Sequence, residues 1–358
     1  MITALLLTCA VSARVVATCR DQERNQRRLS MKVAVLAEDV SAHAVLVSVG
    51  ALYGLELSLD ANIGGWGSHQ RLRVVDTRAG RMFALKQRPP YLSKDEFAVA
   101  VEAHSLASDC GLAADLIRTH DGGNIANYDG DSWILSAWTE APSTVEEDLP
   151  ALARSLARLH RSLAPLAPRT SWSSPEMRWQ ASPDSVESLV RLVDATPLPF
   201  GLSVEIGRAA RSLGEPESPS RLTAGVIHGD AGFDNALVLN EDVRWIDFDN
   251  CRRGRLAWDL LHLVSHAAVV RLINNDGANL DVATVRGFLN DAFRGYASAG
   301  ELDLGIGQID ELLRPLGLAL IVVIISQTNL DDPQVPSHDK AEELLATVLS
   351  MAREISGN

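Results

Sequence analysis

The sequence predicts an α+β protein with two lobes, a small β-rich N-terminal lobe and a larger, mainly helical C-terminal lobe. From Leu57 onward, short apolar strands alternate with glycine-rich or polar turns. After Thr139, the spacing of the apolar residues becomes helical. We therefore assign residues 31–138 to the first lobe and residues 139–358 to the second.

The first lobe is expected to contain an antiparallel sheet of five strands and one helix. The helix should run from about Asp95 to Asp109, because Ser93 can cap its first turn and Gly111 follows its end. Apolar runs bounded by turn residues predict the five strands at residues 59–63, 70–75, 82–86, 116–120 and 132–137.

The second lobe is expected to be mainly helical, with a few short strands near its middle. A predicted helix over residues 149–163 carries four leucines on one face, Leu152, Leu156, Leu159 and Leu163. Helical segments are also expected at residues 184–195 and 202–213, and from Trp258 to the C-terminus. The strands are predicted at residues 225–227, 236–239 and 243–246.

The composition indicates an ordinary globular protein and disfavours several classes. The 358 residues carry a formal charge of -13, whereas a nucleic-acid-binding protein normally presents basic residues to the phosphates. The longest apolar run, Leu316–Ile325, is shorter than the roughly 20 residues that cross a bilayer, so no membrane segment is expected. The cysteines show no C-x-x-C spacing, which favours neither a zinc site nor a disulfide framework and fits the reducing cytoplasm.

The N-terminal residues 1–30 are expected to be a dispensable extension. Residues 2–11 are apolar, but the positively charged region that opens a signal peptide is missing. A second methionine, Met31, begins a stretch with good helical character. We therefore leave the extension out of both lobes.

The clearest chemical motif lies in the middle of the second lobe. An apolar strand leads into His228-Gly229-Asp230, Asn235 follows, and a second apolar strand ends at Asp247. Phosphoryl transfer needs a carboxylate near the acceptor hydroxyl and oxygen ligands for Mg²⁺, and the catalytic loop of kinases has the same Asp-to-Asn offset. Each piece alone could be a turn with a capping aspartate. Together they favour Asp230 as the catalytic base and Asn235 and Asp247 as metal ligands.

Other interpretations of these residues were weighed in the same way. A Ser/His/Asp hydrolase is disfavoured because the sequence has no G-x-S-x-G element. His228 is expected to order the catalytic loop and not to act as a base. Asp249 fits a structural role, with a loose metal or water ligand as the alternative.

This block resembles the aminoglycoside phosphotransferase and choline kinase-like family, which includes homoserine kinase type II and methylthioribose kinase. The resemblance covers roughly residues 50–265. It implies the two-lobed fold of protein kinases, ATP as phosphate donor and Mg²⁺ as metal, and it gives Asp259 a structural role. The matching motifs are His228-Gly229-Asp230, Ile246-Asp247-Phe248, Trp258-Asp259-Leu260 and, upstream, Leu156-Ala157-Arg158-Leu159-His160.

The nucleotide is expected to bind to the first lobe. Lys86 ends a predicted strand that resembles the V-A-I-K strand of kinases, whose lysine holds the α- and β-phosphates. Glu102, in the middle of the predicted helix, is expected to form the ion pair that fixes Lys86. Glu96 lies at the helix start, where carboxylates are common because of the helix dipole.

A glycine loop and a hinge strand complete the predicted nucleotide site. The loop at residues 64–68 departs from G-x-G-x-x-G and is equally consistent with a hairpin turn; its candidate phosphate contacts are Gly65, Gly67 and Ser68. Residues 133–138 resemble the hinge strand, so the backbone from Ser136 to Trp138 is expected to meet adenine. Ala84, Leu237 and Ile246 are expected to sandwich the base, and each fits ordinary core packing equally well.

The predicted function is transfer of the γ-phosphate of ATP to a hydroxyl group of a small metabolite or antibiotic. The alternative acceptor is a Ser or Thr side chain of a peptide, as in natural-product pathways. A different class is a nucleotide-binding pseudokinase with a regulatory or scaffolding role. The intact set of Lys86, Glu102, Asp230, Asn235 and Asp247 counts against that class. The sequence specifies neither the acceptor-binding residues nor the oligomeric state.

Overall fold

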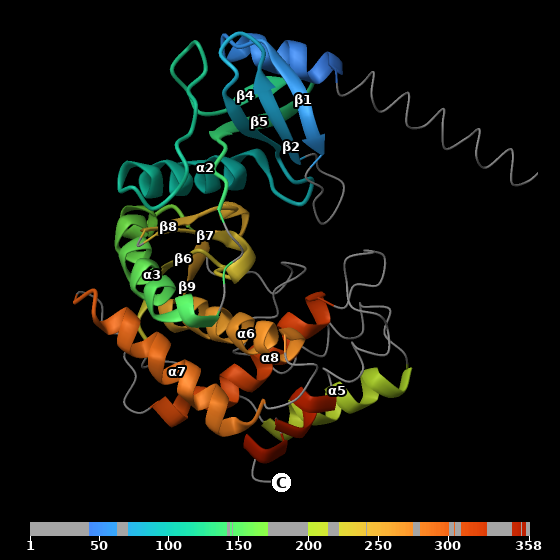
Figure 1. Cartoon of the computed structure of the whole chain (residues 1–358), viewed down its shortest axis with the longest axis vertical. Coiled ribbons are helices and arrows are strands. Elements are labelled where there is room, and N and C mark those ends of the chain that lie inside the picture. The colour runs from blue at the N-terminus through green and yellow to red at the C-terminus, as the bar shows by residue number, and fades with distance from the viewer. Residues whose placement is uncertain are drawn as a thin grey trace, which may run out of the picture.

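The computed structural model describes residues 43–62, 71–141, 144, 146–170, 200–213, 222–240, 242–274, 280–300, 304, 309–327, 346–351 and 353–355. The predicted extension over residues 1–30 and the predicted helix at 184–195 lie outside these ranges, as do Gly65, Gly67 and Ser68. An antiparallel sheet occupies one end of the described structure, and a group of helices occupies the other (Figure 1).

The N-terminal sheet has five strands in the order β1-β2-β3-β5-β4, and all neighbouring strands are antiparallel. Side chains alternate between its faces, and Leu72, Val74 and Leu135 are buried against the helix at residues 43–52. The five-stranded antiparallel sheet is therefore confirmed. Its strands are β1 (Leu57–Asn62), β2 (Arg71–Asp76), β3 (Met82–Gln87), β4 (Ala126–Tyr128) and β5 (Asp131–Ala137).

The strand predicted at residues 116–120 is wrong. That segment makes only an isolated bridge to β5, and the edge strand is β4. Asp129 and Gly130, between β4 and β5, have φ angles of 52° and 83°. Two left-handed residues in succession are what a tight type I′ hairpin turn requires. This turn determines that the segment directly before it, and not residues 116–120, forms the edge strand beside β5.

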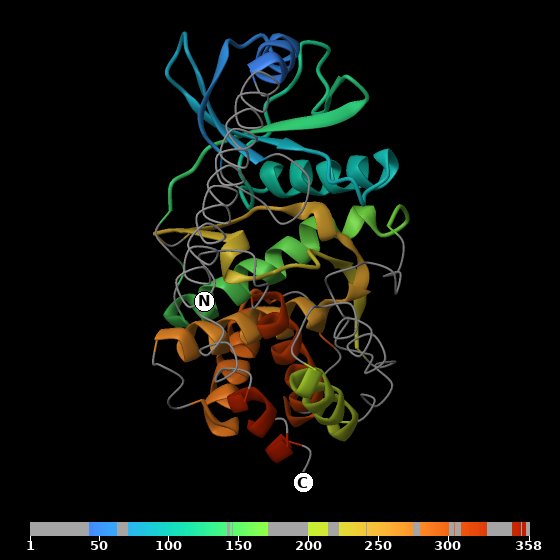
Figure 2. The same ribbon diagram turned by 90° about the vertical axis from the view of Figure 1, so that its right-hand side faces the viewer.

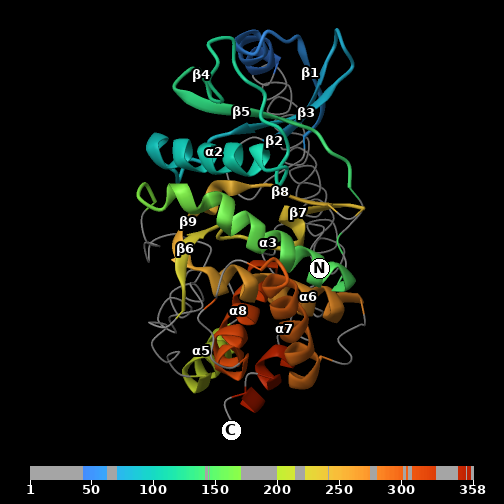
Figure 3. The same cartoon turned by 90° about the vertical axis from the view of Figure 1, so that its left-hand side faces the viewer.

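Helix α2 (Lys94–Asp109) lies between the sheet and the second lobe (Figure 3). The Ser93 hydroxyl accepts a hydrogen bond from the Glu96 N–H at 3.2 Å, and the Glu96 carboxylate accepts one from the Ser93 N–H at 2.8 Å. This reciprocal pair is a capping box, which satisfies backbone donors that the first turn leaves unpaired. The predicted helix and its capping residue are confirmed.

The core of the second lobe is built around helix α3 (Leu149–Leu163), which packs on α6 (Leu256–Asn274) and α7 (Val282–Ala297) (Figure 2). Helix α8 (Leu313–Gln327) packs on α6 and is also in contact with α5 (Phe200–Leu213). The predicted helix at 149–163 is confirmed, and the four leucines predicted to share one face are buried. Among the described residues, no helix has the length and apolar character needed to cross a membrane.

Two small antiparallel sheets lie between α2 and the helices of the second lobe (Figure 3). One pairs β6 (Ala224–Ile227) with β9 (Arg252–Arg255), and the other pairs β7 (Ala236–Leu239) with β8 (Asp242–Trp245). The strand β9 was not predicted. The loop after β6 carries Asp230 and the loop after β8 carries Asp247, so these sheets bring two separate motifs to one side of the lobe.

Candidate active site

The loop after β6 is held by one buried carboxylate. Asp259, in the first turn of α6, accepts hydrogen bonds from the backbone N–H groups of His228 at 2.6 Å and Gly229 at 2.9 Å. His160 of α3 donates a third from Nε2 at 2.9 Å. Burial acts to raise the pKa of Asp259, but His160 and the backbone donors outweigh it, so this pKa lies below its ordinary value. Asp259 thus fixes the backbone that immediately precedes Asp230.

Gly229 lets this loop turn sharply beside the loop that follows β8. Its φ angle is +81°, in the left-handed region that favours glycine. A Cβ atom at this position would lie 2.2 Å from the Asn250 carbonyl oxygen. Any side chain here would therefore push the two loops apart.

The Asp230 carboxylate is partly exposed, with 30% of its side chain accessible. His262 of α6 donates from Nε2 to Asp230 Oδ1 at 3.1 Å, and Asn250 Nδ2 lies 3.4 Å from Asp230 Oδ2. Burial acts to raise the pKa of Asp230, but the hydrogen bond from His262 outweighs it and holds the pKa below its ordinary value. Asp230 is therefore ionised at neutral pH. Among the described residues, Oδ2 receives one long hydrogen bond, from Asn250, which an incoming hydroxyl can replace.

Asn235 and Asp247 are brought together by backbone pairing. The Ile246 N–H donates to the Asn235 carbonyl at 3.0 Å, which places Asp247 next to the start of β7. The Asn235 amide nitrogen donates to the Asp230 carbonyl at 2.9 Å. Its amide oxygen is therefore the atom that can serve as a metal ligand. Asp247 has a left-handed backbone (φ 65°, ψ 62°), a conformation rare in residues other than glycine.

A pocket of about 220 Å³ lies between the sheet, α2 and the β7–β8 hairpin. All five residues predicted to contact adenine, through side chains or backbone, line it: Ala84, Ser136, Trp138, Leu237 and Ile246. Their clustering is typical of a pocket with apolar walls and a few polar groups that orient a ligand.

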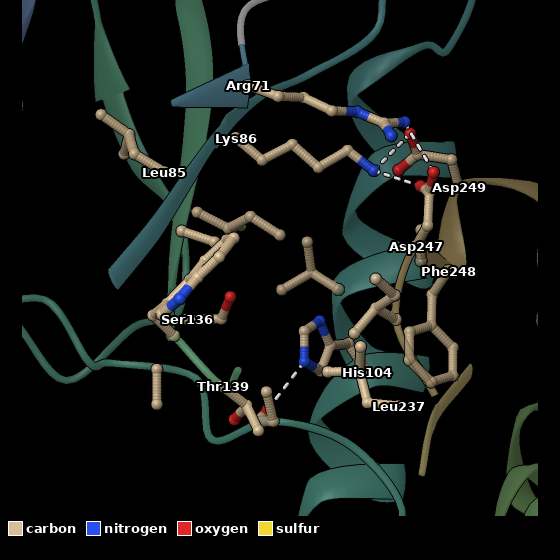
Figure 4. Close-up of a pocket in the computed structure, with 18 of the residues that line it drawn as sticks. Arg71, Leu85, Lys86, His104, Ser136, Thr139, Leu237, Asp247, Phe248 and Asp249 are labelled. Carbon is tan, nitrogen blue, oxygen red and sulfur yellow. Dashed lines mark hydrogen bonds and ion pairs between the residues drawn. The ribbon is translucent and has the colours of Figure 1, made fainter. Parts of the chain in front are cut away.

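Four charged side chains, two from each lobe, form an ion cluster at one end of this pocket (Figure 4). Lys86 Nζ lies 2.5 Å from Asp247 Oδ1 and 2.5 Å from Asp249 Oδ2. The guanidinium of Arg71 lies 2.6 Å from Asp247 Oδ2. Burial acts to raise the pKa of Asp247, but Lys86 and Arg71 outweigh it and hold the pKa well below its usual range. For Asp249, burial dominates and raises the pKa to about 6.

The predicted ion pair between Lys86 and Glu102 is wrong. Glu102 instead forms an ion pair with Arg169, and both side chains are exposed. The reason is helical phase: Phe97, Val101 and His104 of α2 face the pocket, and Glu102 is turned away from that face. Glu96 is engaged in the capping box, so the partners of Lys86 come from the second lobe and not from α2.

The donor set fits a magnesium ion that depends on the nucleotide. In the described part of the chain, no three His, Cys, Asp or Glu side chains are grouped so as to hold a metal by themselves. Magnesium usually takes one or two protein oxygens and completes its octahedron with phosphates and water. Asp247 and the Asn235 amide oxygen match this. Lys86 and Arg71 already pair with the carboxylates of the second lobe, so this position attracts cations. The buried Asp249 Oδ2, although 2.5 Å from Lys86 Nζ, has no hydrogen bond of regular geometry with the described residues and could accept a further contact.

Sequence reasoning missed several residues of the site. Arg71 gave no signal, because its contact with Asp247 joins distant parts of the chain. His262 and His266 had one: with Asp259 they recur on one face of an otherwise apolar helix. Their rings lie 4.8 Å apart, and His266 packs against Gly232 in the catalytic loop.

Solved structures share the fold at low sequence identity. Amicoumacin kinase in complex with AMP-PNP, Ca²⁺ and Ami is 16% identical, with a TM-score of 0.59 over 88% of this chain and 96% of its own. Spectinomycin phosphotransferase with ADP and spectinomycin is 16% identical, with a TM-score of 0.57 over 87% and 98%. Choline kinase from Cryptosporidium parvum Iowa II is 10% identical, with a TM-score of 0.52 over 83% and 89%.

These similarities confirm the two-lobed, protein-kinase-like fold. A search among curated proteins found no significant match. Residues 62–302 match the family described as the phosphotransferase enzyme family, which is more than half of the chain. The chain therefore belongs to the phosphotransferase enzyme family.

Proposed function

We propose that this protein transfers the γ-phosphate of ATP to a hydroxyl group of a small molecule. The observation that carries the proposal is the convergence of Lys86, Asp247 and Asp249 at one end of an apolar pocket. Family membership supplies the reaction class, and two of the similar structures are complexes with AMP-PNP or ADP.

In this proposal the pocket holds adenine, and the phosphates lie at the ion cluster. Ala84, Leu237 and Ile246 enclose adenine, and the backbone from Ser136 to Trp138 meets its polar edge. Lys86 binds the non-transferred phosphates. Gly65, Gly67 and Ser68, which lie outside the described residues, stay predicted phosphate contacts.

Asp230 acts as the base. As the acceptor oxygen attacks the γ-phosphorus and the bond to the β-phosphate oxygen breaks, Asp230 Oδ2 takes the hydroxyl proton and ADP leaves. His262 holds the other carboxylate oxygen and thereby aims the base. Asn235 and Asp247 would hold Mg²⁺, which neutralises charge on the phosphate oxygens when bound. Catalysis is then mostly positioning and electrostatic stabilisation.

The printed names of three similar structures support a small-molecule acceptor. Amicoumacin kinase, spectinomycin phosphotransferase and choline kinase are named for small molecules. A small-molecule acceptor is therefore favoured over a Ser or Thr side chain of a peptide.

The test is ADP release from the wild-type protein with a panel of hydroxyl compounds, amine-bearing antibiotics and peptides included. Asp230→Asn serves as the matched inactive control, since Asn has nearly the same size. ADP release that requires both one acceptor and Asp230 supports the proposal. Tight nucleotide binding with no transfer to any acceptor would favour the pseudokinase class.

A further inference from the structure

We propose that Arg71 is a second phosphate-binding cation, which exchanges its carboxylate partner Asp247 for the phosphate chain when nucleotide and metal bind. This inference rests on the proposed ATP site. In this inference, Arg71 on β2 acts together with Lys86 and changes its partner from a carboxylate to a phosphate.

The position of Arg71 places it beside Lys86. Arg71 on β2 and Lys86 on β3 are register partners in the sheet, and both line the pocket. Their charged ends converge on the same carboxylate from the opposite lobe, Lys86 on Oδ1 and Arg71 on Oδ2 of Asp247 (Figure 4). A ligand that reaches Lys86 therefore also comes within reach of the Arg71 guanidinium.

The ion cluster is balanced as it stands. Arg71 and Lys86 supply two positive charges, and Asp247 and Asp249 supply two negative ones. A phosphate chain that enters alone would draw the cations away and leave two largely buried carboxylates unpaired, which is costly. When a divalent cation enters with it, the carboxylates gain the metal, the phosphates gain Arg71 and Lys86, and every charge keeps a partner.

The chemistry of arginine suits this exchange. Its planar fork forms bidentate hydrogen bonds with carboxylate and phosphate alike, so one side chain serves both partners. The Arg71 side chain is 29% exposed, against 14% for Lys86, so it is the more accessible of the two cations. Since α2 offers no carboxylate to Lys86, Arg71 and Lys86 share the carboxylates of the second lobe.

The experiment measures nucleotide affinity by calorimetry for wild type, Arg71→Gln and Arg71→Lys. Each is titrated with ATP, ADP and AMP, with Mg²⁺ and with EDTA. Arg71→Gln should bind Mg²⁺-ATP about 10- to 100-fold more weakly, as expected for a lost hydrogen bond to a charged group. AMP, which lacks the outer phosphates, should bind within about threefold of wild type and thus reports an intact pocket.

A second arm uses Mg²⁺ alone, read as the shift in melting temperature. Removing the competing guanidinium should make Mg²⁺ bind Arg71→Gln more tightly, the opposite sign to the effect on Mg²⁺-ATP. The ratio of ATP affinities with and without Mg²⁺ should shrink in the same variant. The affinities of Arg71→Lys should lie between those of wild type and Arg71→Gln, because lysine keeps the positive charge but lacks the planar guanidinium.

Arg78→Gln is the matched control, because it makes the same change in charge at a residue that pairs with Glu56 in the exposed turn between β2 and β3. It should bind every ligand as wild type does. If wild type binds Mg²⁺-ATP and Arg71→Gln binds it equally well, the role of Arg71 is refuted and the proposed function stands. If wild type itself binds no nucleotide, the proposed function fails and this inference fails with it.

Discussion

Replacing Asp259 with Asn should destabilise the protein strongly and loosen the loop that carries Asp230. The Asp259 side chain is only 2% exposed and accepts three hydrogen bonds, from His228 N–H, Gly229 N–H and His160 Nε2. Asn has a single acceptor oxygen, and its NH₂ group must replace the other carboxylate oxygen. Even in the better orientation, this NH₂ group faces the Gly229 N–H, so two donors oppose each other.

The magnitude follows from these contacts. A hydrogen bond to a charged group contributes about 1.5–3 kcal/mol, and a buried donor left unpaired costs about 1–3 kcal/mol. The two remaining hydrogen bonds also weaken because their acceptor is neutral. Together these costs lead us to expect a loss of about 3–5 kcal/mol in the free energy of unfolding. This is a large part of the roughly 5–15 kcal/mol typical of a folded protein.

Urea unfolding at pH 7 measures this loss, and amide hydrogen exchange at His228 and Gly229 locates it. Tyr296→Phe is the milder control, since it removes only the hydroxyl 2.8 Å from His160 Nδ1 and should cost about 1 kcal/mol. Because the pKa of Asp259 is lowered in the folded state, its contribution is present above the unfolded pKa of about 3.9 and is lost as the pH falls through the folded value. The gap between wild type and variant should therefore narrow in acid. A loss below about 1 kcal/mol at pH 7 would refute this reasoning.

The remaining predictions concern the proposed reaction and the corrected ion pair. Asp230→Asn should keep its affinity for Mg²⁺-ATP and lose about 10²–10⁴-fold in kcat; turnover within threefold of wild type would remove it as the base. Asp247→Asn should fold normally but reduce the effect of Mg²⁺ on ATP affinity at least about tenfold, which calorimetry with and without EDTA measures. His262→Leu should raise the pKa of Asp230, because the variant lacks the hydrogen bond that lowers this pKa. Activity is lost as the pH falls through the pKa of the catalytic base, so the acid limb of the kcat/KM profile should move to higher pH. Glu102→Gln should change neither ATP affinity nor, beyond about 0.5 kcal/mol, the stability, because its partner Arg169 lies on the surface and not in the pocket.

The sequence predicted correctly those elements that depend on interactions between neighbouring residues. The leucine spacing of α3 and the capping residues of α2 gave both helices, because an apolar face and a satisfied first turn depend on neighbours in sequence. The edge strand was misplaced at residues 116–120 because the prediction did not use the tight turn at Asp129-Gly130, which pairs β4 with β5.

The parts of the site that sequence could not predict depend on distant contacts. The partner of Lys86 depends on which face of α2 lines the pocket. Packing of α2 against β5 and against Phe248 determines that face. The contact of Arg71 with Asp247 spans the two lobes and has no signature in either segment. The spacing of His262 from Asp259 is visible in the sequence. Its contact with Asp230 can be seen only in the folded structure.

The left-handed backbone at Asp247 restricts how this position can change in evolution. Most residue types lose about 1–2 kcal/mol in such a conformation, whereas Gly, Asn and Asp tolerate it. Glu keeps the charge but suffers the backbone penalty, and its longer side chain would displace the carboxylate from Lys86. Under the proposed function, Gly or Asn would keep the backbone of this turn and lose the carboxylate that Asp247 offers to Mg²⁺. In a relative of this chain, either residue at this position would therefore be expected to accompany weaker metal binding in a protein that still folds.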